Sequence, residues 1–443
     1  MKRIFYFLLI AICVACENDD SFSASIGLQL SFSVDTLKMD TLFSKTPSST
    51  YAFWVHNRND KGLLLSTVRL KRGNQTGFRV NVDGVYLDNS NGSQTSNVEI
   101  RRNDSILVFV ELTAELTHQL EPKLVEDDLL FNLESGQEQK VNLRAWAWDA
   151  MKMYSPVIEE DTVIESGQPI VIYGDMTVNE GVTLTLRNTV LYFHDNSGME
   201  VLGTLKAENC VIRGDRLDDM FDYLPYDRVS GQWKGLHFYR QSAGNRLKNT
   251  EIRNAVDAIL LDSAALDNTQ FRLEMDTCVV HNSVNNNIEA VSANLRLSHC
   301  QLSNAGGNSL KISGGIAEIR YCTLAQFYPY SAQRGAALLF TNGYNGHSIP
   351  LQLTCEGSIL TGYGEDELSG IKADDETSFA YSFSNCLLRT PEINDSEHFI
   401  GITWEKPDDE TGGKKHFVKI DEDNLIYDFH LVEDSKAQGL GCY

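Results

Sequence analysis

The sequence predicts an all-β chain, with a small β-sandwich followed by a longer parallel β-helix. A cysteine-containing segment recurs at a constant spacing in the second half, and apolar and polar residues alternate with a period of two along most of the chain. Alternation of this kind indicates strands rather than helices, and a repeat of roughly 20 to 50 residues is typical of stacked structural units.

The repeat is clearest at Cys278, Cys300 and Cys322, which follow one another at steps of 22 residues. Each unit of such a repeat has an apolar face that only its neighbours can cover. Leu295 and Leu297 flank Arg296, an alternation that places the two leucines on the same side of a strand. We therefore expect the three cysteines to form a column through successive coils.

Asparagines predict a second column. Asn254, Asn282 and Asn304 each follow the marker position of their coil by four residues. Asparagine tolerates left-handed backbone geometry and bonds to nearby main-chain groups. We expect these three side chains to stack at one corner of the coils, with three unrelated turn asparagines as the alternative.

The alternation continues beyond these coils, and there a family resemblance becomes specific. Residues 181–186 (GVTLTL), 203–207 (GTLKA), 232–238 (QWKGLHF) and 427–431 (YDFHL) resemble bacterial proteins of the pectin-lyase-like superfamily. The resemblance implies a right-handed parallel β-helix over residues 160–435, with about eight or nine coils. It implies no single activity, because this fold carries lyases, hydrolases, adhesins and inert scaffolds.

Residues 25–150 have the pattern of a separate domain. Short strand-like runs at residues 51–56, 78–82, 106–112 and 140–148 are separated by turn signals such as Asp83-Gly84 and Asn91-Gly92. Several short strands with such turns predict a β-sandwich. The runs at residues 55–57, 98–105 and 127–131 resemble immunoglobulin-like domains of the ASH and Hydin type, which implies a spacer or docking module.

The N-terminus predicts a lipoprotein of the outer membrane. Lys2 and Arg3 precede a short apolar run, and residues 13–16 (CVAC) resemble the lipobox at which a bacterial signal peptide is cleaved. We expect residues 1–15 to be the signal peptide and Cys16 to carry the lipid, with an ordinary secretory signal as the alternative. The acidic linker at residues 16–24 resembles the export signal of cell-surface lipoproteins.

Charge and cysteine content limit the remaining possibilities. The formal net charge is −23, which repels nucleic acid, so we expect no nucleic-acid partner. An odd number of cysteines follows Cys16, which does not indicate a fully paired disulfide framework. The seven are Cys210, Cys278, Cys300, Cys322, Cys355, Cys386 and Cys442. Where stacked coils bring neighbours such as Cys300 and Cys322 together, we expect buried free thiols, with a disulfide as the alternative.

A long acidic and aromatic insertion is the best candidate for a ligand or calcium site. Aspartates supply the oxygen ligands that calcium requires, and tyrosine faces stack on sugar rings, although the spacing matches no known calcium loop. The alternative is a surface lid in which aspartates and arginines pair. The candidate residues are Asp215, Asp218, Asp219, Asp222, Tyr223, Tyr226 and Asp227.

No catalytic residue can be named from the sequence. His237 is expected to be an outward strand residue rather than a catalyst. The predicted anchor and spacer favour a non-catalytic surface protein that binds glycan or acts as a scaffold, with polysaccharide as its partner. The alternatives are a calcium-assisted polysaccharide lyase or glycoside hydrolase, and an adhesin with a protein partner.

Overall fold

The computed structural model describes residues 21–221, 223–265, 269–406 and 412–443. The chain divides into two compact units, Met1–Asp149 and Ala150–Tyr443. Cys16 and the predicted signal peptide lie outside the described residues. Within the part of the chain that is described, no helix has the length and apolar character needed to cross a membrane.

The first unit is a sandwich of two sheets around one core. Alternating residues of β9 are buried, and Val108 and Val110 meet Leu65, Phe131 and Leu143 from the facing sheet. The first sheet contains β1 (Ser31–Phe32), β3 (Tyr51–Asn57), β9 (Asp104–Leu112), β5 (Phe78–Val82) and β6 (Val85–Tyr86). The second contains β2 (Thr36–Phe43), β11 (Glu138–Trp148), β10 (Lys123–Leu133), β4 (Leu63–Leu70), β7 (Gln94–Thr95) and β8 (Val98–Ile100). Short 3-10 turns are η1 (Gly73–Thr76) and η2 (Asn89–Asn91).

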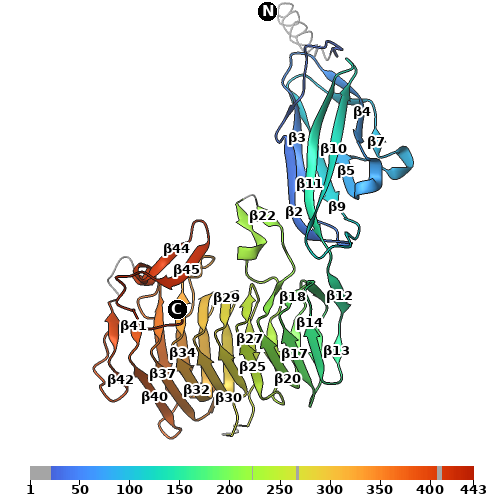
Figure 1. The fold of residues 1–443 in the computed structure, drawn as a ribbon. Coiled ribbons are helices and arrows are strands. Elements are labelled where there is room, and N and C mark those ends of the chain that lie inside the picture. Colours follow the sequence, from blue (N-terminus) through green and yellow to red (C-terminus); the bar gives the residue numbers. More distant parts are fainter. Residues whose placement is uncertain (1–20, 222, 266–268, 407–411) are drawn as a thin grey trace, which may run out of the picture. The chain divides into compact units, whose positions relative to one another are not determined.

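The second unit is built on two long parallel sheets, the arrangement of a parallel β-helix (Figure 1). The eleven-stranded sheet contains β12 (Met151–Tyr154), β15 (Ile170–Tyr173), β18 (Val190–Phe193), β21 (Val211–Gly214), β26 (Glu251–Arg253), β29 (Val279–Ser283), β31 (Gln301–Ala305), β33 (Thr323–Gln326), β38 (Ile359–Gly362), β41 (Leu387–Arg389) and β43 (Thr403–Glu405).

The other sheet has seventeen strands on two adjoining faces. One face contains β13 (Val157–Ile158), β16 (Met176–Val178), β19 (Met199–Val201), β24 (Leu236–Phe238), β27 (Ile259–Leu261), β34 (Leu338–Thr341) and β39 (Leu368–Ile371). The other contains β14 (Thr162–Glu165), β17 (Thr183–Arg187), β20 (Thr204–Glu208), β25 (Asn245–Lys248), β28 (Leu273–Asp276), β37 (Leu351–Glu356), β40 (Phe379–Ser384) and β42 (Phe399–Ile400).

Two long strands, β30 (Ile288–Ser298) and β32 (Leu310–Arg320), join these faces. The first part of β30 pairs with β27, and its second part pairs with β28. The bend depends on Gly315, whose φ is +94° and where an added Cβ would lie 2.3 Å from the Ala293 carbonyl oxygen. Only glycine fits a left-handed bend with backbone this close.

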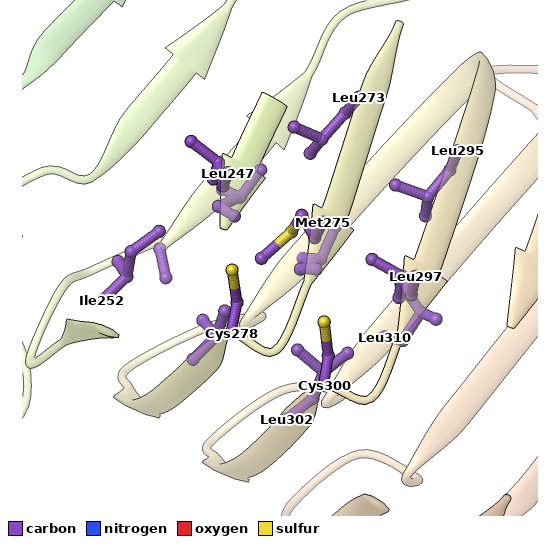
Figure 2. Packing of buried hydrophobic residues seen from close by; sticks show 14 of the residues in the cluster. Leu247, Ile252, Leu273, Met275, Cys278, Leu295, Leu297, Cys300, Leu302 and Leu310 are labelled. Atoms are coloured by element: carbon purple, nitrogen blue, oxygen red, sulfur yellow. The ribbon is translucent and has the colours of Figure 1, made fainter. Parts of the chain in front are cut away.

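Five cysteines occupy one column of the coils, as Figure 2 shows for Cys278 and Cys300, and they are Cys210, Cys278, Cys300, Cys322 and Cys386. Each thiol donates to the backbone carbonyl two residues earlier, as Cys300 does to Ser298 at 3.2 Å. Thr250 and Ser358 make the same bond from the same position in other coils. The position therefore takes a small side chain with a donor, and the described cysteines are free thiols.

The three asparagines also lie at equivalent corners. Asn254, Asn282 and Asn304 are buried and have φ values of +65°, +63° and +56°. The Asn282 side-chain amide donates to Oδ1 of Asn254 at 3.0 Å. A second, exposed asparagine column at Asn209 and Asn249 was not predicted, although these residues are also left-handed and bond to each other at 2.8 Å.

The eleven strands exceed the eight or nine coils that the sequence predicted. The first strand, β12, begins at Met151, within the segment expected to connect the domains, and pairs in register with β15. The early coils are also compact, because Ile170, Leu191 and Ile212 are register partners only 21 residues apart. The repeat therefore starts earlier along the chain, and its early coils have a shorter period, than the cysteine spacing alone indicates.

A C-terminal hairpin covers part of the eleven-stranded sheet. It consists of β44 (Phe417–Asp421) and β45 (Ile426–Leu431), and it follows η4 (Gly412–His416). Phe417 and Phe429 pack with Ala325, Ile359 and Leu387 in a second core outside the coils. Two further hairpins project from the unit: β22 (Asp219–Phe221) with β23 (Leu224–Pro225), and β35 (Gly343–Tyr344) with β36 (His347–Ser348).

The asparagine corner predicts a stability difference between two substitutions. Asn282→Ala keeps the left-handed strain and loses the bonds to Asn254 and Arg228, so it should cost about 2–4 kcal/mol. Asn282→Gly loses the same bonds without the strain and should cost less. Urea unfolding of both variants measures this difference, with Asn249→Ala at the exposed corner as a control. Equal losses for Asn282→Ala and Asn282→Gly would contradict the account.

Buried Glu367 predicts a pH-dependent stability. Burial raises its pKa from 4.5 to about 7, although its carboxylate accepts bonds from the backbone N–H groups of Gly364 and Ala337. Folding therefore favours the protonated form, and this stabilisation is complete below about pH 4.5 and lost as the pH rises through 7. It amounts to about 3 kcal/mol.

Denaturation of the native chain and of Glu367→Gln at pH 5 and pH 8 tests this expectation. The native chain should lose more unfolding free energy than the variant over this interval. Parallel pH profiles for the two proteins would show that Glu367 does not titrate there.

Candidate active site

A row of polar side chains projects from one face of the seventeen-stranded sheet. Thr177, Glu200, His237 and Leu260 are register partners on β16, β19, β24 and β27. The residues on either side of Glu200 and His237 in these strands are buried in the core. Because side chains alternate along a strand, Glu200 and His237 point outward.

The row continues one position beyond two of these strands. The Tyr239 amide donates to the Val201 carbonyl, and the Asp262 amide donates to the Phe238 carbonyl, both at 3.0 Å. These bonds extend the ladder past β24 and β27. Tyr239 and Asp262 are therefore on the same outward face as His237.

Four of these side chains converge, and we call Glu200, His237, Tyr239 and Asp262 the carboxylate–imidazole site. His237 Nδ1 lies 3.4 Å from Glu200 Oε2, and Nε2 lies 3.0 Å from Asp262 Oδ1. The Tyr239 ring stacks on the imidazole with centroids 4.0 Å apart. The three side chains of the row, Glu200, His237 and Asp262, are 21%, 26% and 38% exposed, so solvent and ligands reach them.

The tyrosine is held in its neutral form. A hydrogen bond to Glu200, followed by burial and the charges of Glu200, Asp262 and Asp175, raises the pKa of Tyr239 to about 12. The phenol therefore stays protonated near neutral pH and donates a hydrogen bond to the Glu200 carboxylate. This bond fixes Glu200 from one side while His237 lies on the other.

Arg272 supports the backbone beneath the site. It is buried, and its guanidinium donates to the carbonyl oxygens of Tyr239 at 2.8 Å, Ser242 at 3.1 Å and Asp262. Burial lowers the pKa of Arg272, but not enough to remove its charge near pH 7. One side chain thus holds the two chain segments that carry Tyr239 and Asp262.

A salt bridge borders the site at the neighbouring corner. Lys234 Nζ contacts both carboxylate oxygens of Asp175, at 2.9 and 2.8 Å. Asp175 also accepts from the Gly198 amide at 2.9 Å. Gly235, which follows Lys234, has φ +113°, and a Cβ there would lie 1.6 Å from the Asp257 carbonyl oxygen. Glycine is therefore required at the turn that leads to His237.

The acidic insertion lies elsewhere, over the eleven-stranded sheet. Asp215 contacts His194 Nδ1 at 2.7 Å, and burial raises its pKa despite that bond. Asp218 accepts hydrogen bonds from Nε and Nη2 of Arg216, at 2.8 and 2.6 Å. The Arg216 guanidinium lies over the Tyr226 ring, with its carbon 3.9 Å from the ring centroid. These residues therefore pair within the insertion or with the sheet below it.

The other predicted residues of the insertion do not converge either. Asp227 pairs with Arg213 and Arg253, Asp219 is on β22, and Tyr223 is 78% exposed beside Phe221. Asp222 lies outside the described residues. Among the residues that are described, no group of three or more histidine, cysteine, aspartate or glutamate side chains is arranged to hold a metal ion. Arginines pair with Asp218 and Asp227, and the calcium interpretation of the loop stays a prediction.

The insertion is instead fastened to the coils by the asparagine column. Asn254 and Asn282 donate from their side chains to the carbonyl oxygens of Asp227 and Arg228, both at 2.9 Å. Tyr330 donates to the same Arg228 carbonyl at 2.6 Å. These contacts are those of an anchored surface lid.

Sequence reasoning missed most of the carboxylate–imidazole site. His237 points outward, as expected, but its contacts with Glu200 and Asp262 were not anticipated. Glu200 and His237 are register partners although 37 residues separate them, because the insertion interrupts the regular spacing. The available signal was that both residues follow an apolar residue at the start of a short alternating strand.

Comparison with known proteins gives no family for the chain. No protein-family model matches the sequence, and a search of curated proteins finds no significant match. Among solved structures, a GH87 α-1,3-glucanase catalytic unit from Streptomyces thermodiastaticus is 11% identical with a TM-score of 0.31, over 80% of this chain and 89% of that one. A GH87 α-1,3-glucanase catalytic domain in complex with nigerose is 9% identical, with a TM-score of 0.19, over 81% and 92%.

A third match is shorter. A family 123 glycoside hydrolase from Clostridium perfringens is 6% identical with a TM-score of 0.20, over 29% of this chain and only 30% of that hydrolase. All three matches are glycoside hydrolases, and this finding corrects our expectation of a non-catalytic glycan-binding or scaffold protein. Likenesses this weak transfer no substrate and no catalytic residue, so the proposal below rests on the geometry of this chain.

Proposed function

We propose that the protein is a glycoside hydrolase that cleaves a polysaccharide at the carboxylate–imidazole site. The observation that carries the proposal is the placement of Glu200 and Asp262 on opposite sides of His237, on an accessible face of the coils. Glycosidases use a pair of carboxyl groups that flank the scissile bond. The row of outward side chains along successive coils suits an extended polymer.

The spacing of the pair favours inversion of configuration. The contacts of 3.4 and 3.0 Å and the width of the imidazole between them separate the two carboxyl groups by roughly 8 Å, within the range of about 6.5–9.5 Å of inverting glycosidases. Retaining enzymes hold their carboxyl groups at about 5 Å. In inverting enzymes the larger separation accommodates the attacking water, which at this site would lie beside the imidazole.

Each residue has a role that follows from its contacts. Glu200 and Asp262 supply the two carboxyl groups, of which one protonates the leaving oxygen and the other removes a proton from the water. His237 contacts both carboxylates and fixes their positions. Tyr239 orients Glu200 through its hydroxyl. The glycan would lie along the row, above the imidazole ring.

A calcium-assisted lyase is the less favoured alternative. That reaction uses a base beside carboxylates that hold a cation, and no such set of ligands is gathered in the part of the chain that the structure describes. Hydrolysis requires only the carboxyl pair that the site provides.

Substitution of the carboxyl pair tests the proposed hydrolase. Glu200→Gln and Asp262→Asn should each lower the release of reducing ends from a cleaved polysaccharide by about 100-fold or more. Glu208→Gln is the matched control, because Glu208 is exposed on β20, on the other face of the seventeen-stranded sheet, and pairs with Lys248. A panel of acidic and neutral polysaccharides supplies the substrate. Cleavage that survives both substitutions would exclude this site, and cleavage of no member would exclude the activity.

Two further proposals concern the fold itself. We propose that the coils are right-handed, because connections between parallel strands of one sheet have that hand in about 98% of cases. We also propose that the N-terminal sandwich is immunoglobulin-like and serves as a spacer. Its two sheets and single core support this role.

The location of the protein is also a proposal. The lipobox-like residues 13–16 and the acidic residues that follow support lipidation of Cys16 and display at the surface of the outer membrane. Several acyl chains give stable anchoring where one does not. This places the hydrolase where it meets external polysaccharide.

Substitution of Cys16 tests the location. The native protein should partition into the outer-membrane fraction and be degraded when protease is added to intact cells. Cys16→Ser should abolish lipidation, measured as loss of labelled fatty acid. Equal lipid labelling of both proteins would contradict the anchor, and protection of the native protein from protease would contradict surface exposure.

A further inference from the structure

A basic cavity lies at the C-terminal end of the coils, separate from the carboxylate–imidazole site. Its volume is about 330 Å³, at the lower end of the range of about 300–1,000 Å³ for small-molecule sites. It is bordered by β41 and β43, by η4 and by the C-terminal tail. Figure 1 shows β41 near the C-terminal hairpin, and contacts of η4 with β38 and β44 hold this region together.

Positive charge dominates the cavity lining. Lys406, Lys415 and Lys436 face a single carboxylate, Glu405, in a chain whose net charge is −23. Lys406 and Lys436 are exposed, and no ion pair joins either of them to a carboxylate within the described residues. Such a concentration of cations on an acidic protein attracts an anionic ligand.

The base of the cavity is a buried polar network. Glu405 Oε2 accepts from Thr361 at 2.8 Å, and His416 Nδ1 contacts Ser435 Oγ at 3.0 Å. Burial would raise the pKa of Glu405, but bonds to His416 and Thr361 and the charge of Arg389 lower it instead, so the group remains ionised. The network is therefore rigid and charged.

Cations surround the other oxygen of the Glu405 carboxylate. Glu405 Oε1 lies 3.5 Å from His416 Nε2, 3.6 Å from Arg389 and 4.0 Å from Lys415. Glu405 Oε1 and His416 Nε2 are both buried, so they face each other rather than the open cavity. The one carboxylate of the lining is thus balanced by these cations, which leaves the exposed Lys406 and Lys436 to attract an anion.

The remaining lining suits a sugar ring. Trp404 supplies an aromatic surface, and Leu387 supplies an apolar one. Aromatic side chains with one polar edge commonly line ligand sites of this size. We propose that this cavity binds a carboxylated sugar unit, such as a hexuronate: the lysines hold the carboxylate, and Trp404 contacts the ring.

This inference deepens the proposed function by naming an acidic polysaccharide as the class of ligand, but it does not depend on catalysis. The cavity is formed by β41, β43 and the C-terminal tail, whereas Glu200 and Asp262 are on β19 and next to β27. Binding at the cavity can therefore be measured when no bond is cleaved.

Calorimetric titration of the full chain tests the site. Galacturonate and digalacturonate should bind, whereas glucose and galactose should bind at least 10-fold more weakly. The double variant Lys415→Met/Lys436→Met should weaken uronate binding by at least 10-fold. Lys206→Met, which removes an exposed lysine on β20, should leave it unchanged.

Inorganic phosphate and Trp404→Leu separate a sugar site from a general anion site. Trp404→Leu should weaken uronate binding without changing the affinity for phosphate. If phosphate binds as tightly as uronate and the tryptophan has no effect, the cavity is a general anion site and the proposal fails. Circular dichroism establishes that each variant folds, so absence of uronate binding to the folded native chain would also overturn it.

Discussion

Stacking of side chains from one coil onto the next is the constraint on which the rest of the second unit depends. A single coil buries almost nothing, and its inward residues leave water only when identical positions of neighbouring coils cover them. The register pairs Leu273–Leu295 and Leu295–Ala317 show this arrangement directly. The same register that stacks the core also stacks the outward side chains. Core and candidate site are therefore two consequences of one geometry.

The corners of the coils follow the same logic with polar groups. A backbone that turns sharply has carbonyl and amide groups that no strand partner reaches. At one corner, Cys278, Thr250 and Ser358 each add a small side-chain donor to a carbonyl that also accepts a hydrogen bond from a backbone amide of the preceding coil. Buried asparagines with left-handed backbone satisfy the other, and two of them also hold the acidic insertion in place.

The sequence contained enough information for the general architecture. The cysteine spacing and the period-two alternation predicted parallel stacked strands, because both are local and regular. It did not reveal β12 as the first strand, since Met151–Tyr154 carries no marker cysteine or asparagine. It also did not reveal that β32 bends between two faces. That bend depends on the contact between Gly315 and Ala293, which are 22 residues apart.

The candidate site was less accessible to sequence reasoning. His237 was correctly expected to point outward, but the insertion hides its alignment with Glu200, and Asp262 lies beyond the end of β27. Arg272 donates to the Asp262 carbonyl of its own coil and to the Tyr239 and Ser242 carbonyls of the preceding coil, which no local pattern indicates. The basic cavity depends on Glu405, His416 and Lys436, which irregular segments bring together at the end of the coils.

The stereochemistry of the product tests the central claim most directly. Proton NMR of a freshly started digestion identifies the anomer released before mutarotation. Carboxyl groups held on opposite sides of an imidazole predict a product of inverted configuration. A product that retains the configuration of the substrate would require a closer pair, and would contradict the assignment of Glu200 and Asp262 as the acid and base.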